Sequence, residues 1–172
     1  ATLSVINGAT AGAITITEAD AVSVSGSNAF ATGAVSITTT DGSITVNATN
    51  LSSTNGVITL TANDASAADN ATPAGITVTG TITSGGGAIN LVAADDIAVN
   101  AAVNATAGTV TITADSAAQD TFADTDGAIS GAGLVTGGTV NLAAEEGIAA
   151  TTAAATLSVI NGATAGAITI TE

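Results

Sequence analysis

A short glycine-led motif recurs along the whole chain and limits it to one kind of fold. The motif is a glycine, any residue, and then two aliphatic residues separated by one residue that is usually small and polar. It begins at Gly12, Gly33, Gly56, Gly87, Gly108, Gly138 and Gly166. The interval is shortest from Gly12 to Gly33 and from Gly87 to Gly108, and longest from Gly56 to Gly87. Alternation with a period of two, built largely from β-branched residues, indicates β-strands, and nothing repeats with the period of a helix. Repeats of this length are typical of a solenoid, in which each coil buries its apolar face only against its neighbours.

Each unit continues with a second alternating pair and a third apolar position before the next glycine. The fourth unit has Ile89 and Leu91, then Ile97 and Val99, then Val103. The inward positions expected elsewhere are Ile14, Ile16, Val22, Val24 and Phe30; Val35, Ile37, Ile44, Val46 and Leu51; Ile58, Leu60, Ile76, Val78 and Ile82; Val110, Ile112, Ile129 and Leu134; and, in the sixth unit, Val140, Leu142, Ile148, Leu157 and Val159. We therefore predict an all-β protein that forms a parallel β-solenoid without helices.

A second, longer repeat encloses the short one. Residues 1–18 and residues 155–172 share the same eighteen letters, so the long repeat begins again at Ala155 and contains six units. The predicted organisation is one full long repeat over 1–154 and the start of an identical repeat over 155–172. We expect a tandem array, in which identical repeats or separate subunits stack end to end, because the open ends of a solenoid are sheet edges that template pairing.

Composition excludes several classes of function. The chain of 172 residues includes no Lys, Arg, His, Cys, Met, Trp or Tyr, and 14 acidic residues leave a net charge of −14. A nucleic acid is not an expected partner, because its phosphates require a basic surface. Zinc and redox metals lack their usual ligands, and an enzyme would have neither an imidazole base nor a thiolate. No apolar run approaches the roughly 18 residues of a membrane span, so no membrane insertion is expected.

Two units carry extra residues at the same position, between the last inward residue of the first strand and the first inward residue of the second. This connection runs from Leu60 to Ile76 in the third unit and from Ile112 to Ile129 in the fifth, and in both it is more than twice as long as in most other units. Both insertions should therefore leave the solenoid at one corner. They contain the only proline, Pro73, and one of the two phenylalanines, Phe122. Loops of this kind commonly carry the function of a repeat protein.

The runs GVITLTAN, GAINLVAADDIAVNAAVNATAGTVTITAD and GGTVNLAAEEGIAA resemble the repeats of filamentous-haemagglutinin-like adhesins and other giant bacterial surface proteins. The resemblance covers nearly the whole chain. It implies a right-handed parallel β-helix and an extracellular or cell-surface location. We therefore expect a structural repeat module of a giant adhesin or surface fibre, which provides length and presents loops away from the cell. Host or neighbouring-cell surface glycans are the expected partners of such loops. The alternative is a solenoid with one face that binds ice or glycan.

Only hydroxyl and carboxylate chemistry remains for catalysis, and adjacent carboxylates are candidates for it. They occur at Asp95 and Asp96 and at Glu145 and Glu146. A glycosidase needs two carboxylates that face one groove, whereas neighbouring strand residues face opposite sides, and no aromatic platform is available for a sugar. We expect no catalytic residues and no enzymatic activity; the simpler interpretation is that these charges lie in solvated turns.

Carboxylates also recur in register, and this column is the candidate metal site. In five of the six units, an acidic residue lies four positions after the last inward residue of the first strand. The exception is the fifth unit, which has Ser116 at this position, beside Asp115. Charges about 5 Å apart repel by roughly 0.8 kcal/mol per pair even in water, and calcium accepts irregular cages of oxygen ligands. The candidate calcium ligands are Asp20, Asp41, Asp64, Asp95, Asp96, Asp115, Asp120, Asp124, Asp126, Glu145 and Glu146. The alternative is a screened, solubilising ridge without bound metal.

Threonines occupy many outward positions of the first strand in each unit. Pairs stand at Thr15 and Thr17, Ser36 and Thr38, Thr59 and Thr61, and Thr111 and Thr113, and they are interrupted by Asn90 and Val92 and by Asn141 and Ala143. Flat arrays of this type resemble the ice-binding faces of some β-solenoids. The preferred interpretation is that threonine suits an exposed strand face.

Overall fold

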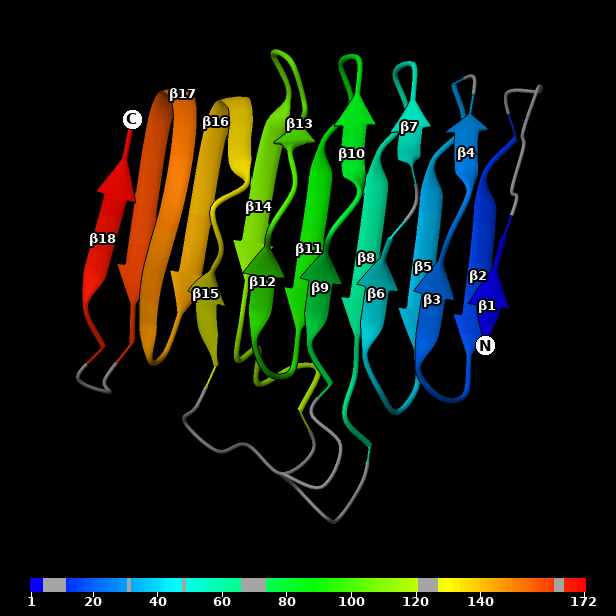
Figure 1. Ribbon diagram of the computed structural model, residues 1–172, viewed down its shortest axis with the longest axis horizontal. Helices are drawn as coiled ribbons and strands as arrows, with labels where there is room; N and C mark the ends of the chain where they lie inside the picture. The colour runs from blue at the N-terminus through cyan, green and yellow to red at the C-terminus, as the bar shows by residue number, and fades with distance from the viewer. Residues whose placement is uncertain (5–11, 31, 48, 66–73, 121–126, 163–165) are drawn as a thin grey trace.

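The computed structural model describes residues 1–172 apart from 5–11, 31, 48, 66–73, 121–126 and 163–165. The described residues form eighteen strands in one sheet, and all the strand pairs among them are parallel (Figure 1). Most strands pair with the strands three places before and after them, as a three-sided coil requires. The described residues contain no helix of the length and apolarity needed to cross a membrane. The predicted parallel β-solenoid is therefore confirmed.

Each coil has three faces, which we number in chain order. Face one holds β2 (Ile14–Glu18), β5 (Val35–Thr39), β8 (Ile58–Ala62), β11 (Ile89–Ala93) and β14 (Thr109–Thr113). Face two holds β1 (Thr2–Leu3), β3 (Val22–Val24), β6 (Ile44–Val46), β9 (Ile76–Val78), β12 (Ile97–Val99), β15 (Ala128–Ser130) and β18 (Ile168–Thr171). Face three holds β4 (Ser27–Phe30), β7 (Asn50–Ser53), β10 (Thr81–Ser84) and β13 (Val103–Asn104). Two longer strands turn corners: β16 (Leu134–Ala144) runs from face three to face one, and β17 (Gly147–Asn161) follows all three faces.

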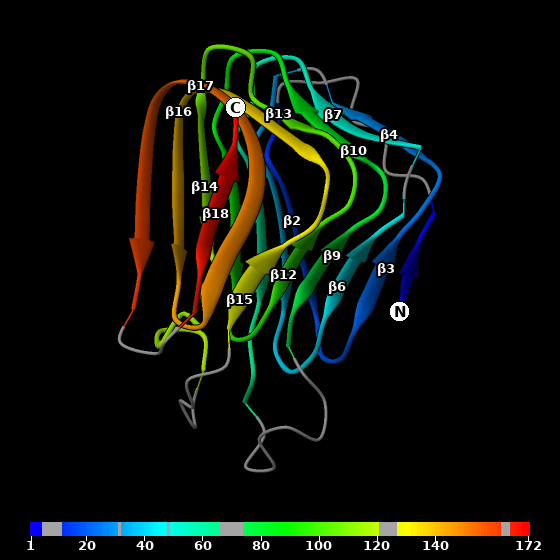
Figure 2. The same ribbon diagram turned by 60° about the vertical axis from the view of Figure 1, so that its left-hand side comes forward.

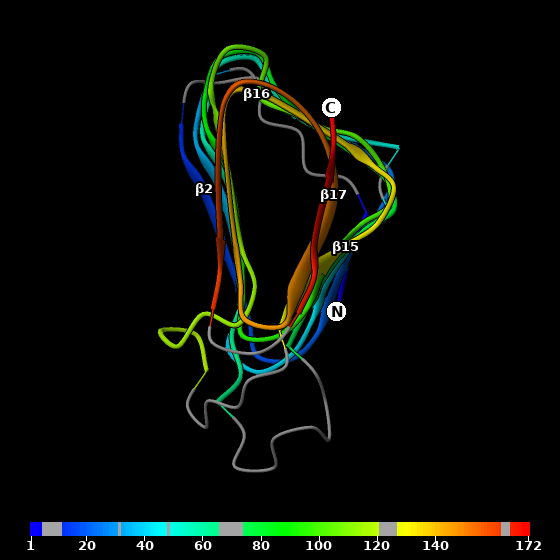
Figure 3. The same cartoon turned by 90° about the vertical axis from the view of Figure 1, so that its left-hand side faces the viewer.

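The coils stack along one axis from the N-terminal to the C-terminal end (Figure 2). In the view along this axis the C-terminal end faces the reader, and the coils turn counter-clockwise as they approach (Figure 3). The winding is therefore right-handed, as the sequence resemblance implies.

The core is a set of aliphatic columns that run along the axis. On face two, Ile44 pairs with Ile76, Ile76 with Ile97, and Ile97 with Ile129, and all four side chains are buried. Full burial of one such side chain contributes roughly 1.5–3 kcal/mol. Every predicted inward residue of the second, third and fourth coils is buried. A single coil could not form this core, because the aliphatic side chains of the inner coils are covered by the coils on both sides.

The motif glycines of five successive coils form a second column. A Cβ atom on Gly56 would overlap the backbone carbonyl of Gly33, and one on Gly87 would overlap that of Gly56. The same relation links Gly33 to Gly12 and Gly108 to Gly87. The glycines that lead the second to fifth short repeats are therefore required by the close approach of adjacent coils at the corner between faces three and one.

The predicted inward position of Leu134 is wrong. Leu134 is 42% exposed, and its neighbour Val135, which is 1% exposed, takes the inward place by pairing with Val103. The sequence Leu134-Val135 offers two aliphatic residues to one inward site, and the strand alternation sends the first of them outward. Periodicity alone could not choose between them because both satisfy the pattern.

The assignment of the sixth coil is also wrong. Leu157 and Val159 do not complete face three of that coil; they lie on face one of a seventh coil, paired with Val140 and Leu142. The inward position on face three belongs to Thr152, which is buried and paired with Val135. The segment from Ala149 to Ala155 consists of alanine and threonine, so it carries no large aliphatic side chain to mark it as a strand.

Candidate functional site

Carboxylates gather at the corner between faces one and two, which we call the acidic corner. It comprises Asp20, Asp41, Asp64, Asp95, Asp96, Asp115, Asp120, Glu145 and Glu146 among the described residues. Backbone hydrogen bonds connect successive turns here: Asp41 donates to the carbonyl of Ala19 at 3.0 Å, and Asp115 donates to that of Asp95 at 3.3 Å. The turn of Asp41 therefore stacks on that of Asp20, and the turn of Asp115 on that of Asp95.

Asp95 and Asp96 act on opposite sides of the fourth coil. The carboxylate of Asp95 accepts a hydrogen bond from the backbone N–H of Ala74 in coil three. The carboxylate of Asp96 accepts one from the backbone N–H of Ala128 in coil five, at 2.7 Å. Ala74 and Ala128 lie close after the insertions of coils three and five, at or just before the start of β9 and β15. The adjacent carboxylates thus hold the chain where each insertion rejoins face two.

The two insertions also meet each other. Asp64 is 4% exposed, and its N–H donates to the carbonyl of Gln119 at 2.9 Å. Asp64 and Asp120 form an isolated parallel bridge. Residues of coils three and five therefore pair directly at this corner, where the shorter turn of coil four leaves room. This agrees with the prediction that both insertions leave from one corner; Pro73 and Phe122 lie outside the described residues.

The remaining carboxylates have different surroundings. Asp20 is exposed, whereas Asp41 Oδ1 is a buried oxygen with no hydrogen-bond partner. Asp115 adopts a left-handed backbone conformation with φ of 51°. Glu145 and Glu146 both donate backbone N–H groups to the carbonyl of Gly127 at 3.1 Å. No three of the carboxylates in the described ranges converge in a metal-binding group, and Asp124 and Asp126 lie outside those ranges. The calcium site stays a prediction.

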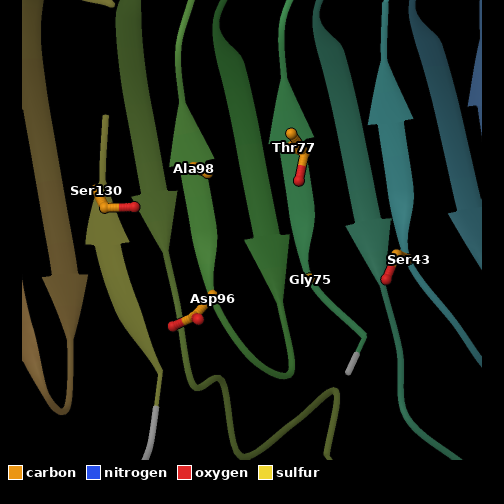
Figure 4. A pocket seen from close by; sticks show the side chains of 6 residues that line it. All are labelled: Ser43, Gly75, Thr77, Asp96, Ala98 and Ser130. Carbon is orange, nitrogen blue, oxygen red and sulfur yellow. The ribbon is translucent and has the colours of Figure 1, made fainter. Parts of the chain in front are cut away.

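A shallow cavity of about 240 Å³ lies on the outer side of face two, next to the acidic corner (Figure 4). It is lined by Ser43, Gly75, Thr77, Asp96, Ala98 and Ser130. Thr77 pairs with Ala98, and Ala98 with Ser130, so the hollow follows one outward column where the middle side chain is small. Hydroxyl groups and one carboxylate line it, which suits hydrogen bonds to a polyol. Sequence reasoning missed this site because its members come from four coils and share no motif.

The outward threonine columns of face one are in the register that the sequence predicts. Thr15 pairs with Ser36, Ser36 with Thr59, and Thr59 with Asn90. The second column runs through Thr17, Thr38, Thr61, Val92, Thr113, Ala143 and Ile160. Val92, Ala143 and Ile160 interrupt its hydroxyl groups, so the array is in register but chemically mixed.

The chain was compared with known proteins at the level of family, sequence and fold. No protein-family model, curated protein or solved structure matches it.

Proposed function

We propose that this chain is a structural repeat module of a giant extracellular adhesin or surface fibre, and that identical modules continue one another end to end. The observation that carries the proposal is the state of the aliphatic columns in the terminal coils. Leu3, Ile14 and Ile16 at one end, and Leu157, Val159 and Ile170 at the other, pack against the core but are only partly buried. The same columns are fully covered in the middle of the solenoid. Further coils at either end would bury these side chains.

Three other features support this role. Stacked coils add about 4.8 Å each, so six coils supply roughly 29 Å of length per long repeat. The net charge of −14, without any basic residue, keeps a long array soluble and opposes lateral association. The fold agrees with the resemblance to filamentous-haemagglutinin-like repeats, which also suggests the extracellular location. Catalysis forms no part of the proposal, since Asp95 and Asp96 bind backbone N–H groups on opposite sides of their coil.

Concentration-dependent association tests the proposal. Sedimentation velocity and negative-stain electron microscopy should reveal end-to-end oligomers at high protein concentration. The substitution Val159→Lys places a charge in the partly exposed core of the last coil and should abolish them. Thr111→Lys adds the same charge to the outward side of β14 and should leave association intact. A monodisperse monomer with ordered terminal coils at all concentrations would refute end-to-end continuation.

A glycan-binding face is the second candidate function. The cavity at Asp96, Thr77 and Ser130 favours it, because carboxylate and hydroxyl oxygens suit the hydroxyl groups of a sugar. A glycan array that compares the chain with its Thr77→Val variant tests this candidate. Binding that disappears in the variant would support a ligand-binding module, whereas the absence of binding on the array would argue against it. An ice-recrystallisation assay tests the threonine columns in the same way, with Thr59→Val as the variant.

A further inference from the structure

The two identical eighteen-residue segments occupy different places in the coil. In the first copy, Ile14 pairs with Val35 on face one. In the second copy the equivalent residue, Ile168, pairs with Ile148 on face two. Leu3 and Leu157 differ in the same way, since Leu3 pairs with Val24 on face two and Leu157 pairs with Val140 on face one. The same sequence therefore supports two registers.

The second placement leaves large side chains exposed. Ile160 is 64% exposed and Ile168 is 51% exposed, although Ile14, the equivalent of Ile168, is half-buried even in a terminal coil. The motif glycine of the second copy also leaves the glycine column, because a Cβ on Gly166 would meet the carbonyl of Glu146. The placement of the first copy retains the β2–β5 ladder, in which Ile16 pairs with Ile37.

The second copy could adopt the placement of the first copy, because the chain has room for the connection that this placement requires. If Leu157 lay on face two, as Leu3 does, the connection from Leu142 to Leu157 would have to cross the acidic corner. Because Leu157 would take the second inward position of face two, as Leu3 does beside Val24, the comparable connection of an insertion runs from Leu60 to Val78 and is a few residues longer. The chain therefore already contains coils that accommodate a connection of this length at this corner.

We infer that residues 155–172 of one copy can replace residues 1–18 of a second copy. Ile168 and Ile170 would then lie on Val35 and Ile37 of the second copy, and Leu157 beside its Val24. Because the two segments are identical, the ladder contacts that β1 and β2 make are available to the borrowed segment. Exchange of an identical element between copies is a low-cost route to association. Because this exchange is head-to-tail, each copy can still accept another copy at its free end, so the assembly can grow into a fibre. This inference rests on the proposed end-to-end function and specifies the junction.

Disulfide trapping between two copies of the chain tests the exchange. The chain contains no cysteine, so introduced cysteines can react only with each other. A donor with Ile168→Cys is mixed with an isotopically labelled acceptor with Val35→Cys, and the mixed disulfide is quantified by mass spectrometry. Paired positions of adjacent parallel strands lie within the distance that a disulfide spans. The control acceptor carries Ile112→Cys, which is buried in the middle of the solenoid. If exchange occurs, the Val35→Cys acceptor should yield about tenfold more mixed disulfide than this control. Adding Ile16→Asp to the Val35→Cys acceptor weakens its own first segment and should increase the yield further.

A second cysteine pair distinguishes exchange from simple stacking of the ends. Leu157→Cys in one chain and Ile14→Cys in the other would meet if the seventh coil kept its present register and abutted β2 of the next copy. A mixed disulfide at this pair alone would overturn the exchange and leave the proposed end-to-end function standing. No mixed disulfide at either pair, with association absent in sedimentation, would overturn both. Circular dichroism of each variant shows whether the solenoid is retained.

Discussion

Glycines decide how closely the coils approach each other. Adjacent coils meet at the corner between faces three and one with the backbone carbonyl of one glycine against the α-carbon of the next, as at Gly33 and Gly56. Buried hydroxyls complete this corner: Ser53 Oγ accepts a hydrogen bond from the N–H of Gly56 at 2.8 Å, and Ser84 Oγ donates to the carbonyl of Gly56 at 3.0 Å. The polar backbone of the corner is therefore paired inside the coil, where water has no access.

The substitution Gly56→Ala should destabilise the protein. Its Cβ would overlap the backbone of Gly33, which cannot move without disturbing the neighbouring strands, so we expect a loss of about 1–3 kcal/mol in the free energy of unfolding. Urea denaturation measures it. Gly12→Ala is the matched control, because its added Cβ meets no atom within 4 Å among the described residues other than its chain neighbours. Equal stability of the two variants would show that the glycine column does not set the coil spacing.

The register of the strands on face two depends on two kinds of contact, the aliphatic columns and the hydrogen bonds of turn carboxylates. The columns hold β9, β12 and β15 in register on face two. Asp95 and Asp96 add directional bonds to the N–H groups of Ala74 and Ala128. A carboxylate is a stronger acceptor of a backbone hydrogen bond than a neutral group, and its removal leaves a donor unpaired. These turns therefore secure the strands that follow the two insertions.

Replacing Asp95 by alanine should lower the free energy of unfolding by about 1–2 kcal/mol relative to Asp20→Ala. Both variants remove one negative charge from a chain with a net charge of −14, so both gain the same stability from weaker charge repulsion. Asp20 is exposed, and its variant is the control for this gain. Hydrogen exchange of the β9 amides should increase only in Asp95→Ala. Identical denaturation midpoints for the two variants would remove the proposed anchoring role.

Calcium binding at the acidic corner is a separate prediction. If the aligned carboxylates hold calcium, calcium chloride should raise the thermal midpoint more than sodium chloride does at matched ionic strength, and a chelator should reverse the difference. Differential scanning fluorimetry with the two salts measures this. Equal stabilisation by both salts would mean that the corner is a screened, solubilising ridge.

The whole molecule is a one-dimensional stack, so stability should depend on the position of a coil along the axis. Central side chains such as Leu91 are covered by coils on both sides, whereas Leu157 in the seventh coil is partly exposed. In a stack of this kind the terminal coils open first, because each coil contacts only its neighbours. The same logic makes the ends the natural sites of association.

Leu91→Ala should cost about 2–5 kcal/mol, as expected for a cavity in a close-packed core. Leu157→Ala removes the same atoms from face one but should cost less than half as much, since its side chain already meets solvent. Chemical denaturation of the monomer at low concentration measures both values. If the two costs are equal, the terminal coil is as well ordered and covered as the centre, and partial exposure cannot drive association.

The amino-acid sequence by itself determined the fold class and nearly all of the large side chains of the core, but not its buried alanines. Alternation of β-branched residues reports which side chains face inward, because the strand period is two, and the recurring glycine reports where coils must touch. Those are local properties, so Ile44, Ile76 and Ile97 were predicted correctly as one buried set.

Only the tertiary structure decided what depends on neighbours from other coils. The choice of Val135 over Leu134 was set by its partner Val103, and the place of Thr152 by the strand stacked against it. The cavity beside Asp96 and the opposite bonds of Asp95 and Asp96 join residues of different coils, which no local pattern encodes. Two identical segments even adopt different registers, because the register of a strand is a property of the ladder that receives it as well as of its own residues.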